Sequence, residues 1–277
     1  MANPRTDFPP IRACLFDMDG LLINTEDIYT LCHNILLARY SSGPMTWDIK
    51  SQLQGRPAAQ SIALLLAHFN LTSKVDIGTY TSELHAIQDE EFRKAAPLPG
   101  VERLLKQLET ARTVSSGKKV HVALATSSGE GHFRIKTDHI LELFSIFTSE
   151  RRILGDDVRI PKGRGKPSPD IYLVALNAIN DSLEAGEEKI RPEECLVFED
   201  GIPGVVAGRR AGMRVVWCPH EGLAGLWVGR EGEVLAGRGE GSEIDPEQLG
   251  VVGDGWGEQR KTLEDFPWEK YGVVTSV

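Results

Sequence analysis

Two carboxylates, Asp17 and Asp19, directly follow a short apolar run near the start of this 277-residue chain, and Gly20 comes next. At the end of a buried strand, two acids this close together repel each other, which costs free energy. A hard divalent cation bound by carboxylates is the simplest way to offset that repulsion. The pair therefore predicts metal-assisted chemistry at the carboxyl end of a strand, where open α/β sheets bind their ligands.

Two further apolar runs also end in reactive side chains. Thr126 and Ser127 follow one of them, and Glu199 and Asp200 follow the other. The carboxyl ends of parallel strands lie along one edge of a sheet, so we expect these side chains to meet the first acid pair in one site. Lys166 lies in a glycine-rich loop before a predicted helix and could add a positive charge there.

These groups are suited to phosphoryl transfer. The Asp17 carboxylate could attack phosphorus and form an aspartyl-phosphate. Asp19 could protonate the leaving alkoxide and then deprotonate the attacking water. Asp17, the backbone carbonyl of Asp19 and Asp200 could hold Mg²⁺, with waters as the other ligands. Thr126 and neighbouring N–H groups could bind phosphoryl oxygens, and Lys166 could neutralise the charge that develops.

Taken one at a time, the same residues have plainer interpretations. Asp17 and Asp19 could form a solvated turn or a structural ion site, and Thr126 could cap a helix. Glu199 with its neighbouring acid is an ordinary turn sequence, and a lone lysine is most often a surface residue. Their joint presence at three strand ends, in this order, argues against coincidence.

Four short apolar runs predict the buried parallel strands that would position these residues, and helical patterns lie between them. One helix covers residues 101–108. Another begins with Ser168 as its N-cap and Pro169 as its first residue, and has Leu173 on its apolar face. Because strands alternate with helices, we expect an α/β fold with a Rossmann-like, doubly wound parallel sheet. The predicted strands cover residues 11–16, 120–125, 195–198 and 214–218.

Residues 27–96 interrupt this rhythm, because their pattern is helical throughout and contains no convincing strand. We interpret them as an all-helical cap inserted into a core of residues 1–26 and 97–277, where it could act as a lid over the acid pair. The plainer alternative is a set of ordinary helices packed on the sheet. Residues 220–277 are a divergent extension and tail. We expect residues 222–241 to form a flexible or loosely helical, glycine-rich surface excursion, and the apolar end of the chain, residues 266–271, to dock onto the body.

Composition and net charge indicate which kinds of molecule this protein binds and in which compartment it folds. The formal net charge of −9 argues against a general nucleic-acid-binding surface, but a metal ion could still attract a small anionic substrate. No run approaches the ~20 apolar residues that cross a membrane, and the first residues lack the apolar segment of a secretory signal. The four scattered cysteines are typical of buried free thiols in a reducing compartment, the cytoplasm or also the nucleus. We expect a monomer.

The motifs together resemble those of the haloacid dehalogenase superfamily, in family order within residues 12–219. The resemblance implies a Rossmann-like core, a helical cap and Mg²⁺-dependent phosphoryl transfer through an aspartyl-phosphate. It implies that Asp17 is the nucleophile and Asp19 the acid and base. The implied phosphate-binding residues are Thr126, Ser127 and Lys166, and the implied metal-binding residues are Asp17, Asp19, Glu199 and Asp200.

Within the superfamily, the chain resembles the pseudouridine-5′-phosphatase group most closely, through Tyr40 and residues 47–50, 123–129 and 153–157. This resemblance implies hydrolysis of a small phosphomonoester. The substrate would be a nucleotide such as pseudouridine 5′-phosphate, or a sugar or polyol phosphate.

Two alternatives remain open at this point. Gly55 and Arg56 resemble the substrate loop of β-phosphoglucomutase-like sugar phosphomutases, which share every core motif. Tyr29, however, stands where those mutases carry a histidine, which favours hydrolysis. The second alternative is a binding or scaffold protein on a retired enzyme core, and the intact acids argue against it.

Overall fold

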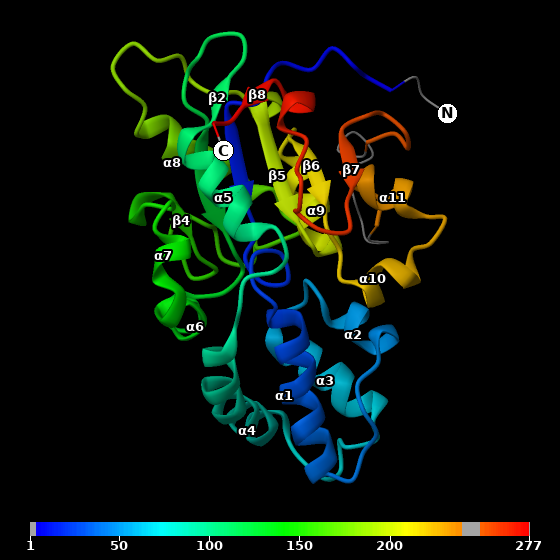
Figure 1. Ribbon diagram of the computed structural model, residues 1–277. Helices are drawn as coiled ribbons and strands as arrows, with labels where there is room; N and C mark the ends of the chain where they lie inside the picture. The colour runs from blue at the N-terminus through cyan, green and yellow to red at the C-terminus, as the bar shows by residue number, and fades with distance from the viewer. Residues whose placement is uncertain (1–3, 240–249, 277) are drawn as a thin grey trace.

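The computed structural model describes residues 4–239 and 250–276 and contains a six-stranded parallel sheet with helices on both faces (Figure 1). The strand order is β4-β3-β1-β5-β6-β7, and β2 pairs with β8 in a separate antiparallel ribbon. The expected α/β fold with a parallel sheet is thereby confirmed. The strands are β1 Ala13–Phe16, β2 Arg112–Thr113, β3 His121–Ala125, β4 Arg152–Ile153, β5 Cys195–Glu199, β6 Arg214–Trp217, β7 Gly257–Gln259 and β8 Val273–Val274.

Strand β1 lies inside the sheet, with Phe16 in register with Leu124 of β3 and Phe198 of β5. Successive residues of a strand face opposite sides of the sheet. Phe16 therefore packs in one apolar cluster and Leu15 in another. Because both faces are buried, these strands are almost entirely apolar, which is why their runs stand out in the sequence.

The helices that flank the sheet cover its two faces. Helix α5 packs with the cluster on one face, and α8 and α9 pack with the cluster on the other. Within the described residues, no helix is both long and apolar enough to span a membrane. The bounds are α5 Val101–Thr110, α6 Glu130–Thr137, η2 Asp138–Ile140, α7 Leu141–Phe144, η3 Ser149–Arg151, α8 Asp170–Asp181, η4 Pro192–Glu194, α9 Ile202–Arg210, α10 Glu221–Leu226, α11 Glu231–Leu235 and η6 Trp268–Tyr271.

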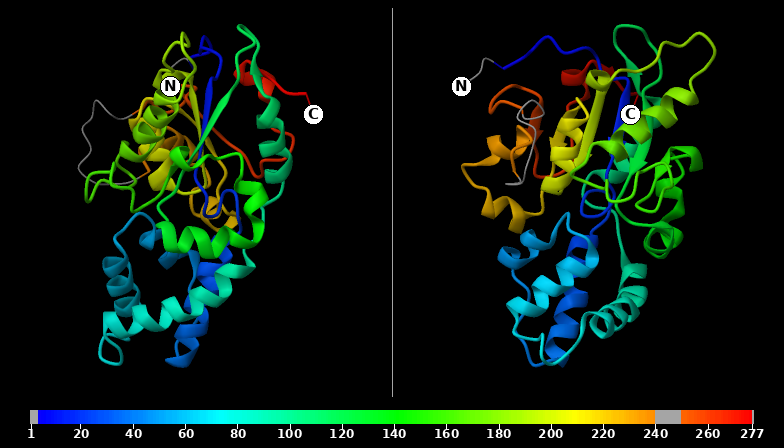
Figure 2. Two further views of the ribbon diagram at one scale, coloured as in Figure 1. Left: turned by 90° about the vertical axis from the view of Figure 1, so that its left-hand side faces the viewer. Right: turned by 180° about the vertical axis from the view of Figure 1, so that it is seen from behind.

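Residues 25–94 form a helical segment without a strand, as the sequence predicts. All views place it beyond the carboxyl ends of the sheet strands (Figures 1 and 2). Its division from the core as a separate cap domain stays a prediction. The segment contains α1 Thr25–Arg39, α2 Trp47–Leu53, α3 Ala58–His68, α4 Ile77–Glu91 and η1 Phe92–Lys94.

The C-terminal extension touches this helical segment through α10. Trp47 of α2 stacks on His220, with ring centroids 4.7 Å apart and ring planes 21° apart. His220 Nε2 also lies 3.2 Å from Asp27 Oδ1 of α1. A Cβ atom at Gly222 would lie 2.0 Å from Trp47 Cδ1, so only glycine permits this close approach.

Residues 222–241, predicted to form a flexible or loosely helical surface excursion, contain the two short helices α10 and α11 in their described part. The sequence did not predict β7, which adds a strand to the sheet, with Gly257 in register with Val215 of β6. The physical reason is that β6 would otherwise expose a row of unpaired backbone groups at the sheet edge. Residues 240–249 lie outside the described residues.

The apolar end of the chain docks onto the body, as expected. Trp268 is 4% exposed, and its indole Nε1 donates a hydrogen bond to Gln107 Oε1 of α5 at 2.8 Å. Phe266 and Tyr271 stack beside it, with ring centroids 5.3 Å apart. The tail is therefore part of the apolar layer on one face of the sheet.

Helix α8 begins one residue later than predicted, with Pro169 rather than Ser168 at the N-cap. The backbone N–H of Ser168 instead closes a turn onto the carbonyl of Gly165. Leu173, predicted on the buried face, is 36% exposed. The reason is that Tyr172 is turned inward, where it is fully buried and reaches the end of β5.

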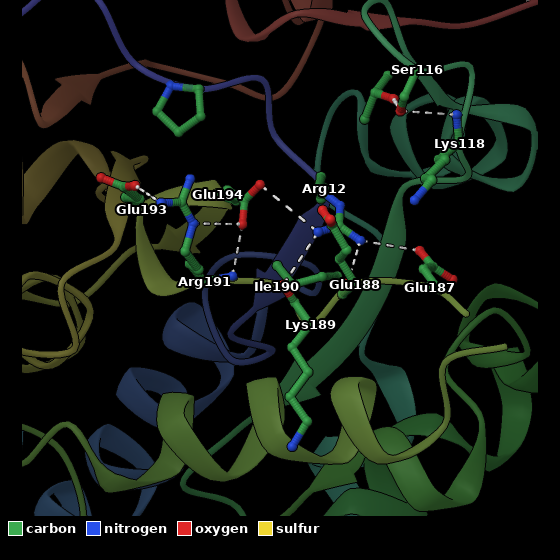
Figure 3. Close-up of polar contacts among 12 residues, drawn as sticks. Arg12, Ser116, Lys118, Glu187, Glu188, Lys189, Ile190, Arg191, Glu193 and Glu194 are labelled. Atoms are coloured by element: carbon green, nitrogen blue, oxygen red, sulfur yellow. Dashed lines mark hydrogen bonds and ion pairs between the residues drawn. The ribbon is translucent and has the colours of Figure 1, made fainter. Parts of the chain in front are cut away.

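Arg12 lies at the opposite, amino end of β1, where it holds the chain that leads into β5 (Figure 3). Its guanidinium donates to the carbonyl of Glu188 at 2.7 Å and pairs with the Glu187 carboxylate at 3.2 Å. Glu194 Oε1 lies 3.8 Å from the same guanidinium. These contacts fasten the end of the sheet that faces away from the acid pair.

Candidate active site

Three neighbouring strands, β3, β1 and β5, bring the predicted site residues to one edge of the sheet. Asp17 follows β1, Thr126 follows β3, and Glu199 ends β5 with Asp200 next in the chain. The three acids and Lys166 line a cavity of about 500 Å³ whose opposite wall belongs to the helical segment. The sheet order thus explains how residues far apart in the sequence meet in one place.

Lys166 links two of the buried carboxylates. Its ammonium nitrogen lies 2.5 Å from Asp17 Oδ1 and 2.6 Å from Glu199 Oε1. Glu199 accepts two further hydrogen bonds, from the Tyr172 hydroxyl to the same Oε1 at 2.6 Å and from the Gly201 N–H to Oε2 at 3.2 Å. Burial alone would lower the pKa of Lys166, but Asp17 and Glu199 raise it above its usual range, which keeps the side chain charged.

Asp17 and Asp200 have too little positive charge around them. Burial raises the pKa of Asp17 to about 8, against the lowering effect of Lys166. Burial also raises the pKa of Asp200 well above its usual range, and Glu26 and Asp17 add to this effect. None of the described residues donates a hydrogen bond to the Asp200 carboxylate. A cation placed between these acids would favour their ionised forms.

The donor set fits a hard divalent cation. Asp17, Glu199 and Asp200 each offer a carboxylate oxygen, and these oxygens lie within 4.8 Å of one another. Mg²⁺ prefers oxygen ligands of this kind. The turn after Asp17 needs a glycine, because Gly20 has φ +80° and a Cβ atom there would lie 2.4 Å from Asp200 Oδ2. Asp17 and Asp200 are the residues best placed to hold such an ion.

The Asp19 carboxylate is held by a separate set of donors. Its Oδ1 accepts from Thr25 Oγ1 at 2.7 Å and from Lys136 Nζ at 2.6 Å, and its Oδ2 accepts from Ser128 Oγ at 2.7 Å. Burial would raise the pKa of Asp19, but Lys136, Thr25 and Ser128 together lower it below its usual range. The pKa values of the two acids of the first motif are therefore shifted in opposite directions, although each acid contacts a buried lysine, and the Asp19 side chain lies outside the group of three carboxylates.

Lys136 is a site residue that the sequence reading missed. It lies on α6, is 0% exposed, and donates to Tyr29 Oη and Ser128 Oγ at 2.9 Å as well as to Asp19. Its ammonium also lies 4.5 Å from the centroid of the Phe92 ring. Because Tyr29 and Phe92 belong to the helical segment, the buried Lys136 connects Asp19 to that segment.

The hydroxyl residues after β3 divide into two kinds. Ser127 is exposed and lines the cavity, whereas Thr126 is 0% exposed. Thr126 Oγ1 accepts from the N–H of Ser128 at 3.1 Å and lies 3.4 Å from Asp19 Oδ2. The predicted binding of phosphate by Thr126, Ser127 and Lys166 stays a prediction.

From the helical segment, Gly55 and Arg56 line the cavity, and Arg56 Nε donates to the carbonyl of Gln52 at 2.6 Å. Their predicted contact with substrate stays a prediction. Lys50 and Glu26, which were part of the motifs but were not predicted as site residues, line the same cavity as an ion pair with Nζ 2.7 Å from Oε2. Lys50 is only 6% exposed, so this pair is an additional charged feature of the wall.

Comparisons with known proteins show the family to which this chain belongs. The sequence model of a family described as haloacid dehalogenase-like hydrolase matches residues 11–212. The chain belongs to this family. A probable pseudouridine-5′-phosphatase of Saccharomyces cerevisiae is 43% identical to this hydrolase over 230 residues, which cover 83% of the chain and 91% of the relative. A mitochondrial (DL)-glycerol-3-phosphatase of Arabidopsis thaliana is 31% identical over 87% of the chain and 74% of its own length.

Among solved structures, a putative β-phosphoglucomutase of Thermotoga maritima has the same fold as this hydrolase. The TM-score is 0.56 at 26% identity, with 81% of the chain and 97% of the bacterial protein covered. The expected superfamily, and a phosphatase within it, are confirmed. The roles of the individual site residues stay predictions.

Proposed function

We propose that this hydrolase is a Mg²⁺-dependent phosphatase that cleaves a small phosphomonoester through an aspartyl-phosphate on Asp17. The observation that carries the proposal is the convergence of Asp17, Asp200 and Lys166 in one cavity at the carboxyl end of β1. A carboxylate nucleophile, oxygen ligands for a hard cation and a fixed positive charge are what phosphoryl transfer needs.

The proposed reaction has two displacements at phosphorus. In the first, Asp17 Oδ attacks, the bond from phosphorus to the ester oxygen breaks, and Asp19 donates a proton to the departing alkoxide. In the second, Asp19 takes a proton from water, the water oxygen attacks phosphorus, and Asp17 leaves as the carboxylate. Lys166 stabilises the charge that develops in both steps. When bound by Asp17 and Asp200, Mg²⁺ would neutralise the crowded carboxylates and the phosphoryl oxygens.

The charge state of Asp19 favours its role as the base that accepts a proton from water over its role as the acid that protonates the alkoxide. Its lowered pKa favours the ionised form, which is the form that accepts a proton from water. The first step needs the protonated form, which becomes rarer as the pH rises. We therefore expect protonation of the alkoxide to limit turnover of esters with poor leaving groups above neutral pH.

For the substrate, we propose a nucleotide such as pseudouridine 5′-phosphate first and a sugar or polyol phosphate second. The yeast relative is named as a probable pseudouridine-5′-phosphatase, and the plant relative as a glycerol-3-phosphatase. A cavity of about 500 Å³ suits a ligand the size of a mononucleotide.

The test is phosphate release from a panel of pseudouridine 5′-phosphate, other nucleotides, sugar phosphates and glycerol phosphates, with Mg²⁺ and with Asp17→Asn as the control. We expect release by the wild type, a trapped phosphoenzyme on the wild type, and neither with the variant. Absence of turnover on every substrate would overturn the proposal and favour a scaffold protein. Transfer of label from glucose 1-phosphate to the 6-position without net release would favour a phosphomutase instead.

We further propose that the protein is a cytoplasmic or nuclear monomer whose partner is a small phosphorylated molecule, not nucleic acid. The four cysteines are free, and Cys14, Cys32 and Cys195 are buried, which fits a reducing compartment. Cys218 was expected to be buried too, but it is partly exposed because it follows the last residue of β6.

A further inference from the structure

One wall of the cavity carries three polar side chains that the proposed reaction does not use. Gln88 and His85 come from α4 of the helical segment, and His132 comes from α6. The rings of His85 and His132 meet edge to face, with centroids 5.8 Å apart and planes 85° apart. His132 also packs against Phe92, with ring centroids 5.4 Å apart. This wall is therefore built from both the helical segment, through α4, and the sheet core, through α6.

Gln88 is the unusual member of this wall. It is only 4% exposed, yet it lines the cavity, and its side-chain amide forms no hydrogen bond with any residue that the structure describes. Buried amides are nearly always paired, because an unpaired one forfeits the hydrogen bonds that it makes in water. The imidazoles of His85, which is exposed, and His132, which is half-buried, form no hydrogen bond within the described chain either, but solvent can reach them. Gln88 is therefore the buried group on this wall that has a hydrogen-bonding partner to gain from a ligand in the cavity.

This wall is also short of charge. Burial lowers the pKa of His132, and Lys136 and His85 lower it further, so the imidazole is neutral near pH 7. Burial likewise lowers the pKa of His33, which lines the same cavity, to about 4. Of the lysine and the arginine that line the cavity from the helical segment, Lys50 is already paired with a carboxylate, and Arg56 donates to the backbone carbonyl of Gln52. Such a surface suits an uncharged group with its own donors and acceptors better than a second phosphate.

We propose that Gln88, with His85 and His132 beside it, is the specificity-determining residue for the organic part of the substrate. It selects phosphomonoesters whose leaving group carries an imide or amide edge, as a pyrimidine base does. The Gln88 amide offers one acceptor and one donor side by side, which is the complement of a neighbouring C=O and N–H on such an edge. This inference rests on the proposed phosphatase function and names the substrate class for the same cavity.

The test compares two substrates that differ only in the base. Pseudouridine 5′-phosphate carries an imide edge, and ribose 5-phosphate is the same sugar phosphate without the base. A site built to hydrogen-bond its substrate discriminates strongly against an analogue that lacks the group. We therefore expect the wild type to prefer the nucleotide in kcat/KM by about a hundredfold or more.

Gln88→Met keeps the size of the side chain and removes both hydrogen-bonding groups, and Gln88→Glu keeps the size and removes the donor. Both variants should lose at least about tenfold in kcat/KM for the nucleotide, with the loss largely in KM. Both should retain their activity on ribose 5-phosphate, which shows that the variants are folded. Gln60→Met is the matched control, because Gln60 is exposed on α3 of the same helical segment and does not line the cavity.

The outcomes separate the two proposals. Equal use of the two substrates by the wild type, or an unchanged preference in both Gln88 variants, would overturn the role of Gln88 and leave the phosphatase function standing. Absence of phosphate release from every phosphomonoester by the wild type would overturn the phosphatase function itself. A preference that falls in the Gln88 variants but not in Gln60→Met supports the inference.

Discussion

The ammonium nitrogen of Lys136 lies 2.6 Å from Asp19 Oδ1, in a position that solvent does not reach. A buried ion pair of this kind is costly to break, because removal of one partner leaves the other charge without compensation. In this protein the remaining partner would be the acid that we assign to proton transfer. Loss of Lys136 should therefore affect both the stability of the fold and the proton transfer assigned to Asp19.

Lys136→Met should move the whole pH profile of kcat/KM upward by about one pH unit or more. Without the lysine, only the hydrogen bonds from Thr25 and Ser128 act against burial, so the pKa of the Asp19 carboxyl rises. Both the limb that needs the base and the limb that needs the acid then shift to higher pH. Steady-state rates from about pH 5 to 9 on one substrate measure this. An unchanged profile in a folded variant would show that Lys136 does not set the charge of Asp19.

Asp19→Asn should affect substrates according to their leaving groups. Esters of simple alcohols need protonation of the alkoxide, so we expect kcat to fall by about 10²- to 10⁴-fold on them. The leaving group of an activated ester such as 4-nitrophenyl phosphate needs no proton. With that substrate, the rate of phosphoenzyme formation in the variant should therefore fall far less. Asp17→Asn, in contrast, should abolish the phosphoenzyme with both substrates. Equal losses on both kinds of ester in Asp19→Asn would contradict the assigned role.

Asp200→Asn should stabilise the metal-free protein and remove its response to Mg²⁺. The folded-state pKa of Asp200 is raised well above the ordinary value of 3.8, so the folded state binds more protons than the unfolded state above about pH 4. Stability of the metal-free wild type therefore falls as the pH rises. At about pH 8 the variant should gain roughly 2–6 °C in Tm over the wild type in EDTA, and less at about pH 5.

Millimolar MgCl₂ supplies the matching control for Asp200. It should raise the Tm of the wild type, because a ligand that binds only the folded state stabilises it, and should leave Asp200→Asn almost unchanged. Differential scanning fluorimetry with and without EDTA measures both effects. A Mg²⁺-dependent rise of equal size in the variant would place the ion elsewhere.

Trp268→Ala should destabilise the protein by about 3–5 kcal/mol, which is typical for removal of a large buried aromatic side chain. The indole is 4% exposed and bonded to Gln107, so the variant loses both packing and a buried hydrogen bond. Glu269→Ala, at the next and exposed position, should change the free energy of unfolding by less than about 0.5 kcal/mol. Urea denaturation of the two variants checks this, and similar midpoints would mean that the tail does not contribute to the core.

The sequence predicted the sheet core and the acids at its edge because both have strong local signals. Strands buried on two faces are continuous apolar runs, and parallel topology forces their carboxyl ends together. That is enough to bring Asp17, Asp200 and Lys166 into one cavity without knowledge of any side-chain geometry.

Lys136 and Gln88 were not predicted, because a polar residue in a helix is ordinarily on the solvent face. A weak signal existed for Lys136, which lies three residues after the buried Phe133 and therefore on the same face of α6. Nothing comparable marked β7, whose Gly-Glu-Gln sequence has no apolar alternation. It becomes a strand because the edge of β6 offers it hydrogen-bonding partners, and such tertiary effects are not visible in local patterns.

The close approach of Gly222 to Trp47 has a consequence for the divergence of such enzymes. Gly222 lies outside residues 11–212, which match the family, yet a side chain there would displace the Trp47 ring. That ring lies 4.4 Å from the ammonium of Lys50, which lines the cavity. Two enzymes with identical motifs could therefore come to prefer different substrates through changes in an extension that contains none of the motif residues.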